Sequence, residues 1–365
     1  MKSQSILPRS IFTVLMILTL FCTLPLQAQT SGGTLMGRVV DSGGGDLPGV
    51  TVTATNDATG VSRSTVSSSD GTYRFALLPA GTYSVTGGLE GFGAVTIQQV
   101  TLNIATTRTL DITLQPAAVR DSIIVTADAP LISTSPAIGT VVSQQELENL
   151  PLNGRQFANL ASLAPGTSLG VNPDPTKPGQ LVVALNGGIG RNVNYTIDGG
   201  DNTDDTIGGA LQNYNLEAVQ EFKIQTQQYK AEFGRSTGGV LSVVTKTGTN
   251  NLSGSIYGFF RDESLNSRTE TERRLSRDKQ PYERQQYGLS IGGPFVRDKA
   301  HYFLTFENTD RDTQFAVNTR GVFPQLDGQS FPIPYEDVLV TGKMTLDLTP
   351  SQFLQVRGGY QKYSD

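Results

Sequence analysis

The chain has 365 residues, with 28 Lys and Arg against 33 Asp and Glu, a formal net charge of −5, one Cys and one His. A site built from several His or Cys ligands is therefore excluded, which removes zinc fingers, iron–sulfur clusters and His-rich zinc centres. The acidic balance argues against nucleic acid as a partner, because a nucleic-acid-binding surface needs a basic patch. The 40 glycines favour many short strands and turns over long helices.

The first 28 residues have the pattern of a cleaved export signal. Lys2 and Arg9 precede an uncharged apolar run from Ile11 to Leu26, and Gln27-Ala28 offers a small-residue cleavage site. The run is shorter than the roughly 20 residues of a membrane-spanning helix, which makes a retained anchor the lesser alternative. Because the single cysteine, Cys22, lies inside the signal, we expect a mature chain without disulfides or thiol chemistry.

Residues 31–116 show short alternations of apolar and polar residues, separated by Gly, Pro, Asp and Ser. Alternation with a period of two places every second side chain on one face of a strand, and regularly spaced turn signals favour a β-sandwich. Three sets of residues are expected in its core: Val50, Val52 and Ala54; Tyr73, Phe75 and Leu77; and Leu110, Ile112 and Leu114.

Two phrases of this segment, Ser69-Asp-Gly-Thr-Tyr-Arg-Phe and Leu78-Pro-Ala-Gly-Thr-Tyr-Ser-Val, resemble the carboxypeptidase-regulatory-like family. The resemblance implies a transthyretin-like or starch-binding-like β-sandwich without catalysis of its own. Carbohydrate binding is inferred for parts of that superfamily, and it normally uses exposed aromatic platforms. Tyr73, Phe75 and Tyr83 stand at alternating positions, so we expect them in the core instead.

Residues 117–248 are expected to form a mixed domain. The β-prone stretch Ser122–Asp128 is open to two interpretations, an exposed edge strand that accepts a partner strand or an ordinary first strand of the domain. Ser143 and Glu146 form a capping box for a short helix toward Leu150. A second helix is expected at 156–163, and strands at 181–185, 193–197, 221–226 and 240–245.

Five segments in this order resemble the plug of TonB-dependent outer-membrane transporters, especially the Oar-like group: Leu150–Phe157, Tyr195–Asn202, Glu217–Ile224, Tyr229–Ser236 and Gly239–Gly248. The resemblance implies an α+β plug, a location in the cell outer membrane, no cofactor and no metal. It identifies a candidate TonB box, which would pair as an added strand with the periplasmic energy-coupling protein TonB: Ile123, Ile124, Val125, Thr126 and Ala127. Other implied partners are outer-membrane lipids and an unidentified extracellular ligand, with carbohydrate among the candidates.

Four aspartates, at positions 198, 201, 204 and 205, lie close together in this segment. Their spacing lacks the central Gly and the closing Glu of an EF-hand, so a solvated loop is expected rather than a calcium site. The only histidine, His301, precedes an aromatic residue at the base of a predicted membrane strand. We expect it to be a girdle or turn residue rather than a catalyst.

Residues 249–365 alternate aromatic and small residues in stretches of about ten, the length that a tilted membrane strand needs. Strands are predicted at Leu252–Arg261, Gln285–Phe295, His301–Arg311, Val338–Leu348 and Phe353–Tyr363. Long connections (262–284 and 312–337) alternate with tight ones (296–300 and 349–352), as extracellular loops and periplasmic turns do in outer-membrane barrels. The segment Tyr287–Lys299 also resembles the Oar-like barrel.

The first long connection holds four arginines, at positions 268, 273, 274 and 277. They predict either a solvated loop tip or a contact with lipopolysaccharide phosphates or an acidic ligand. Five strands cannot close a barrel in lipid, because open edges leave backbone groups unsatisfied. Since the family pattern is a barrel of about 22 strands, we expect this chain to be an N-terminal fragment of a mainly β protein: sandwich, plug and the first strands of an antiparallel barrel.

The leading hypothesis is a TonB-dependent outer-membrane receptor or transporter that takes up an unidentified ligand with energy from the inner-membrane proton-motive force. The alternative is a surface module in which the sandwich binds carbohydrate or protein. An enzyme is disfavoured, because the chain has one His and no paired acidic motif at a defined turn. No catalytic residue is predicted.

Overall fold

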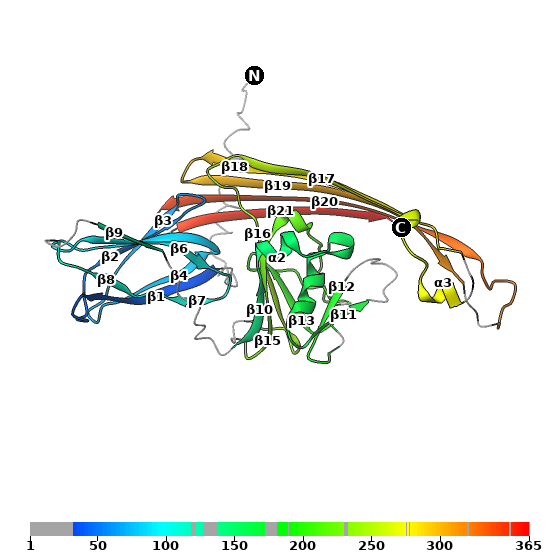
Figure 1. The fold of residues 1–365 in the computed structure, drawn as a ribbon, viewed down its shortest axis with the longest axis horizontal. Coiled ribbons are helices and arrows are strands. Elements are labelled where there is room, and N and C mark those ends of the chain that lie inside the picture. The colour runs from blue at the N-terminus through cyan, green and yellow to red at the C-terminus, as the bar shows by residue number, and fades with distance from the viewer. Residues whose placement is uncertain are drawn as a thin grey trace, which may run out of the picture.

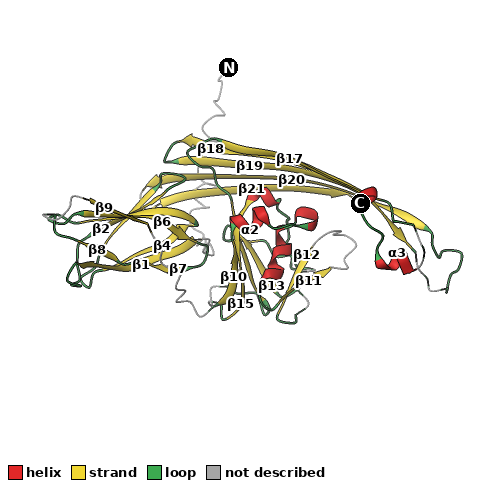
Figure 2. Ribbon diagram, viewed as in Figure 1, coloured by secondary structure: helices red, strands yellow, loops and turns green. Residues whose placement is uncertain are grey.

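The computed structural model describes residues 32–117, 122–126, 137–171, 181–188, 190–206, 208–229, 233–274, 276, 278–317, 319, 321–349 and 352–364. The expected export signal, with Cys22, lies outside these residues. Three bodies follow one another along the chain: a sandwich (32–126), a middle domain (137–249) and a strand wall (253–364) (Figure 1). Strands dominate all three, and the short helices lie in the middle domain and at one end of the wall (Figure 2).

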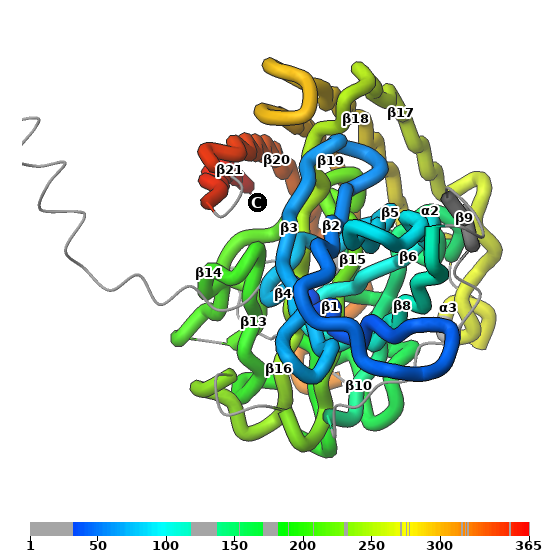
Figure 3. Tube along the Cα trace, turned by 90° about the vertical axis from the view of Figure 1, so that its left-hand side faces the viewer, coloured from blue at the N-terminus to red at the C-terminus, as the bar shows by residue number. Residues whose placement is uncertain are grey.

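The sandwich is built from two sheets. The first contains β1 (Gly32–Asp41), β4 (Thr72–Pro79), β7 (Thr107–Thr109) and β8 (Ile112–Leu114). The second has the order β3 (Ser62–Val66), β2 (Thr51–Asn56), β5 (Gly81–Gly88), β6 (Ala94–Leu102) and β9 (Ser122–Thr126). Viewed from the left of Figure 1, these strands lie in front of the middle domain (Figure 3).

The core between the two sheets contains the residues predicted from the alternation, with one exception. Tyr73 and Phe75 are buried, and so are the two other predicted sets, Val50, Val52 and Ala54 and Leu110, Ile112 and Leu114. Leu77 instead is 49% exposed, and Leu78 occupies the core with an exposure of 3%. A β-bulge explains the exchange, because the register of β1 against β4 shifts between Leu35 and Gly33 and reverses the faces beyond it.

The second sheet of the sandwich ends in the strand that carries most of the candidate TonB box. β9 pairs in parallel with β6, in a register that runs from Ala94↔Ser122 to Gln98↔Thr126. No described strand lies on the other edge of β9. The strand is thus both an edge strand and a part of the sandwich, whereas Ala127 lies outside the described residues.

The middle domain has a five-stranded sheet and a separate hairpin. The sheet order is β10 (Ile138–Val142), β15 (Val219–Gln227), β16 (Gly239–Thr245), β13 (Val193–Ile197) and β14 (Gly200–Asp201), and the hairpin pairs β11 (Thr167–Val171) with β12 (Leu181–Leu185). Its short helices are α2 (Gln144–Asn149), η1 (Asn153–Arg155), η2 (Phe157–Leu163) and η3 (Leu216–Ala218). The capping box of Ser143 and Glu146 is present, and the predicted second helix is a 3₁₀ helix.

The strand wall is an antiparallel sheet in sequence order, β17 (Ser253–Asp262), β18 (Tyr282–Val296), β19 (Ala300–Ala316), β20 (Ser330–Thr349) and β21 (Gln352–Ser364). Helices η4 (Glu263–Leu265) and α3 (Glu270–Arg274) follow β17. All five predicted strands are present, but the expected connection 312–337 is shorter. Pairing of β19 with β20 continues to Ala316↔Ser330, because the two strands keep one register along their whole length.

The two faces of the wall differ in chemistry. Large apolar side chains are exposed on the face turned away from the middle domain, among them Ile256, Phe260, Leu289, Leu304, Met344 and Val356. The opposite face buries polar groups, among them Gln286, His301, Thr305, Glu307, Thr341 and Lys343. The wall arches over the middle domain (Figure 1), so this polar face is the one that the middle domain covers. Within the described part of the chain, no helix is both long and apolar enough to cross a membrane.

Candidate functional site

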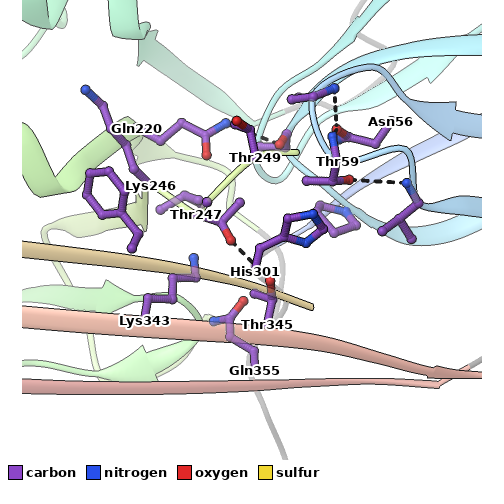
Figure 4. A pocket seen from close by; sticks show the side chains of 18 of the residues that line it. Asn56, Thr59, Gln220, Lys246, Thr247, Thr249, His301, Lys343, Thr345 and Gln355 are labelled. Carbon is purple, nitrogen blue, oxygen red and sulfur yellow. Dashed lines mark hydrogen bonds between the residues drawn. The ribbon is translucent and has the colours of Figure 1, made fainter. Parts of the chain in front are cut away.

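A chamber of about 940 Å³ lies where the three bodies meet. The sandwich contributes its turns around Ala58 and Ala80, the middle domain contributes the segment from Val244 to Thr249, and the wall contributes its polar face. Figure 4 shows side chains from all three projecting toward the chamber, with Lys343, Thr345 and Gln355 on the side of the wall. The hydroxyls of Thr247 and Thr345 are 3.2 Å apart and join the middle domain to the wall.

The strongest contact between the middle domain and the wall is an ionic cluster centred on Asp198. This residue lies in the two-residue turn Asp198-Gly199 between β13 and β14, with φ of 48° and 79°, a conformation that Asp and Gly accept. The carboxylate is 3.0 Å from Lys343 Nζ and 3.3 Å from Arg357 Nε. It also accepts the Thr245 backbone N–H at 3.0 Å and the Thr245 hydroxyl at 2.5 Å.

Burial makes this cluster costly to break. The side chains of Asp198 and Lys343 are 3% and 5% exposed. Lys343 Nζ also donates to the Thr245 carbonyl at 2.8 Å, so the cation has two partners from the middle domain. Removing one member of such a pair leaves the other charge buried without compensation.

The expectation of a solvated aspartate loop is therefore wrong for part of the cluster. Asp198 is buried in the ionic contact with the wall, and Asp204 is also buried. Asp201 and Asp205 are exposed and form ion pairs with Arg235. The described residues contain no group of His, Cys, Asp and Glu side chains that could hold a metal ion.

The expectation that His301 is a girdle or turn residue is also wrong. Its side chain is buried on the polar face of β19, and its Nε2 lies 3.0 Å from Asn250 Oδ1. Alternation along the strand places Tyr302 on the opposite face, which separates the two neighbours. Asn250 also donates to Asp298 Oδ1 at 2.6 Å and accepts the Asp298 N–H at 2.9 Å. His301 thus helps to fix the connection between the middle domain and the wall.

A second polar contact lies farther along the wall. The Tyr257 hydroxyl donates to Glu307 Oε2 at 2.7 Å, and the Arg155 guanidinium stacks on the rings of Tyr257 and Phe259. Arg155 also pairs with Glu217 of the middle domain at 2.8 Å. Arg155 therefore joins the middle domain to the first strand of the wall through charge and aromatic contact.

The arginines of the first long connection are paired where they are described. Arg268 pairs with Asp278 at 3.2 Å, and Arg273 and Arg274 both pair with Glu270 at 2.9 Å. Arg277 lies outside the described residues. These pairings agree with a solvated loop tip.

The sandwich contacts both other bodies at the chamber. Arg63 forms an ion pair with Asp347 at the end of β20. The Asn250 backbone N–H donates to the Ala58 carbonyl at 3.0 Å. On the middle domain, Gln220 Nε2 donates to the Ala80 carbonyl at 3.2 Å.

Two charged side chains of β15 hold one turn of the sandwich. The Ile104 N–H donates to Glu221 Oε1 at 2.5 Å, and Lys223 Nζ donates to the Ala105 carbonyl at 2.8 Å. Both side chains are buried, and burial raises the pKa of Glu221 to about 7. The sequence predicts β15 but not this contact, because nothing in a strand pattern says which turn of another domain meets it.

Comparison with known proteins agrees with this architecture at both ends of the chain. Residues 34–115 match the carboxypeptidase regulatory-like domain, and residues 244–330 match the outer membrane beta barrel domain. The chain is mainly β. Its sandwich is similar to the carboxypeptidase regulatory-like domain, and its strand wall, which is similar to the outer membrane beta barrel domain, places it in the outer membrane. The described wall is open at β17 and β21.

The similarity to one curated protein extends through the middle domain. The chain is 28% identical over 293 residues to the TonB-dependent transporter Oar of Myxococcus xanthus, which covers 76% of this chain and 27% of that protein. The chain thus spans about a quarter of the length of this relative. The recognised resemblance to TonB-dependent transporters of the Oar-like group is confirmed.

Solved structures give a weaker likeness. The siderophore receptor PirA of Acinetobacter baumannii is 17% identical, with a TM-score of 0.45 over 62% of this chain and 31% of that chain. The outer membrane transporter YddB of Escherichia coli is 15% identical, with a TM-score of 0.44 over 63% of this chain and 35% of that chain.

Proposed function

We propose that this protein is a TonB-dependent outer-membrane transporter, in which the middle domain is the plug and the strand wall is part of the surrounding barrel. The observation that carries the proposal is the contact between these two bodies. A folded domain lies against the polar face of a wall whose other face is apolar, and buried charges lock the two together. A plug inside a barrel requires this division of faces, because lipid accepts only the apolar side.

The coupling segment in this proposal is Ile123–Ala127. Its described part forms β9 and leaves one strand edge without a described partner, which is the geometry that an added strand needs. TonB would supply that strand from the periplasm and transmit energy from the inner-membrane proton gradient. The transported ligand stays unidentified, and carbohydrate is one candidate class.

A proline scan of β9 tests the assignment. Neighbouring residues of a strand direct their N–H groups to opposite edges, so Ile124→Pro and Val125→Pro remove donors from different sides of β9. We expect one of the two to reduce binding of the soluble periplasmic part of TonB at least tenfold. Val125→Ile keeps every N–H and should bind as the unmodified chain does. Equal binding by both proline variants and the control would contradict the assignment of the coupling segment.

The alternative function, a carbohydrate-binding module, receives less support from the sandwich. Tyr73, Phe75 and Tyr83 are 3%, 6% and 3% exposed, as expected for core residues. Phe92 is half-buried against the same core. The described sandwich therefore presents no aromatic platform of the kind that sugar sites use. We infer that the protein has no catalytic role, in keeping with a relative that is named a transporter.

A further inference from the structure

The sandwich is attached to the rest of the molecule at the boundary of the chamber. Its turns at Ala58 and Ala80 line the chamber and contact Asn250 and Gln220 through the hydrogen bonds described above. Arg63 adds the ion pair with Asp347 at the rim of the wall. If the sandwich moved away, these turns would leave and one side of the chamber would open.

A further attachment is the latch, which we define as Glu221 and Lys223. The two side chains stand two residues apart on β15 and are 6% and 7% exposed. They hold the Ile104 N–H and the Ala105 carbonyl, two neighbouring backbone groups of one turn. That turn follows directly after β6, so β6 is connected to the plug through very few residues.

β6 is also the strand to which β9 is paired. Five residue pairs join them in parallel. Tension along β9 shears all of these pairs at once, whereas the sandwich is held to the other two bodies by separate contacts: the latch, single hydrogen bonds at Ala58 and Ala80, and the ion pair of Arg63 with Asp347. The direct covalent route from β9 to the plug passes through ten residues, 127–136, whereas the route through β6 passes only through the turn that the latch holds.

We propose that the sandwich is a cap on the periplasmic side of the chamber, and that tension on β9 releases this cap at the latch before it reaches the plug. This inference rests on the proposed function, because it takes β9 as the strand that TonB pulls. The sandwich is then an element of the transport cycle, and its release precedes any rearrangement of the plug.

Force spectroscopy tests the order of release. An atomic-force tip that carries the periplasmic part of TonB is applied to supported outer-membrane patches that contain the protein and turn their periplasmic face toward the tip. We expect two rupture events, the first at short extension and the second with the longer extension of an unfolding plug. Glu221→Leu/Lys223→Met keeps the volume of both side chains and should remove the first event or reduce its force by at least half. Arg38→Ala, which breaks the exposed pair of Arg38 with Asp46 within the sandwich, should change neither event.

A first event that keeps its force in the latch variant would overturn the inference. Absence of any capture by the TonB-coated tip would overturn the proposed function, and the order of release with it. Capture followed by plug unfolding as the only event would leave the proposed function intact and refute the cap.

Chemical labelling tests the cap without TonB. In a Cys22→Ala background, Gln355→Cys places one thiol at the chamber, and Val66→Cys places one on the exposed surface of the sandwich. We expect the latch variant, or Arg63→Ala if the latch variant does not fold, to accelerate maleimide labelling at position 355 at least tenfold. Labelling at position 66 should not change. An unchanged rate at position 355 in a folded variant would refute the cap.

Discussion

Replacement of Asp198 by alanine is the sharpest perturbation of the contact between the middle domain and the wall. The carboxylate bridges Lys343 and Arg357 and accepts two hydrogen bonds from Thr245. Its loss leaves Lys343, whose side chain is 5% exposed, without its ionic partner. Because a buried unpaired charge is strongly unfavourable, we expect a loss of about 3–5 kcal/mol of stability.

Asp201 provides a matched control on the same turn region. Its pair with Arg235 is exposed, at 41% and 57% for the two side chains, so Asp201→Ala should cost at most about 1 kcal/mol. The double variant Asp198→Ala/Lys343→Met removes both charges and should recover part of the lost stability, because it no longer buries an unpaired cation.

Urea titration of the membrane-inserted protein, followed by pulse proteolysis of the middle domain, measures the effect. With an m-value of about 2 kcal/mol/M, a loss of about 3–5 kcal/mol lowers the midpoint by about 1.5–2.5 M. A midpoint for Asp198→Ala within about 0.5 M of the Asp201→Ala midpoint would refute the buried ionic lock. A double variant less stable than Asp198→Ala alone would refute the explanation by an unpaired cation.

Three further outcomes follow from the structure. Gly37→Ala should unfold or strongly destabilise the sandwich, because the added Cβ would lie 1.9 Å from the Leu110 carbonyl oxygen. In the control Gly88→Ala the added Cβ meets no atom within 4 Å, so this variant should be tolerated. Thermal melting followed by circular dichroism compares the stability of the two variants. Docking of the sandwich should weaken as the pH rises from about 4.5 to about 7, because burial raises the pKa of Glu221 to about 7 and undocking returns the pKa of this carboxyl toward its usual value. Glu221→Gln should therefore flatten the pH dependence of the rate of maleimide labelling at position 355. A labelling rate in Glu221→Gln that depends on pH as steeply as in the unmodified chain would contradict this. Arg155→Lys should loosen the middle domain from β17, because a lysine cannot stack on two rings and pair with a carboxylate as a guanidinium does. A middle domain that resists protease equally well in Arg155→Lys and in the unmodified chain would contradict this expectation.

The strands and their faces were largely predictable from the sequence. All five wall strands, the capping box at Ser143 and the buried trios of the sandwich follow from alternation and cap chemistry, which act over a few neighbouring residues. Leu77 departs from the pattern because a bulge depends on the register of the partner strand. The extension of β19 and β20 toward Ala316 and Ser330 likewise depends on the continued pairing of two strands.

The candidate site was less predictable. Asp198 belongs to an acidic cluster that its spacing assigns to a solvated loop, and Lys343 is one cation in a strand of alternating residues. They form a buried pair because the turn after β13 meets the polar face of β20, although the two positions are far apart in the sequence. In the same way, alternation places His301 on one face of a strand but does not say which face the middle domain covers.

The sequence by itself determined that the chain is mainly β, where most of its strands lie and which residues form the core of the sandwich, because these features depend on local pattern. Only the tertiary structure decided which charges are buried in pairs, that β9 is joined to β6, and that Glu221 and Lys223 hold the sandwich against the middle domain. Those features depend on contacts between residues remote in the chain, and the free energy of a charge depends on the surroundings that such contacts create.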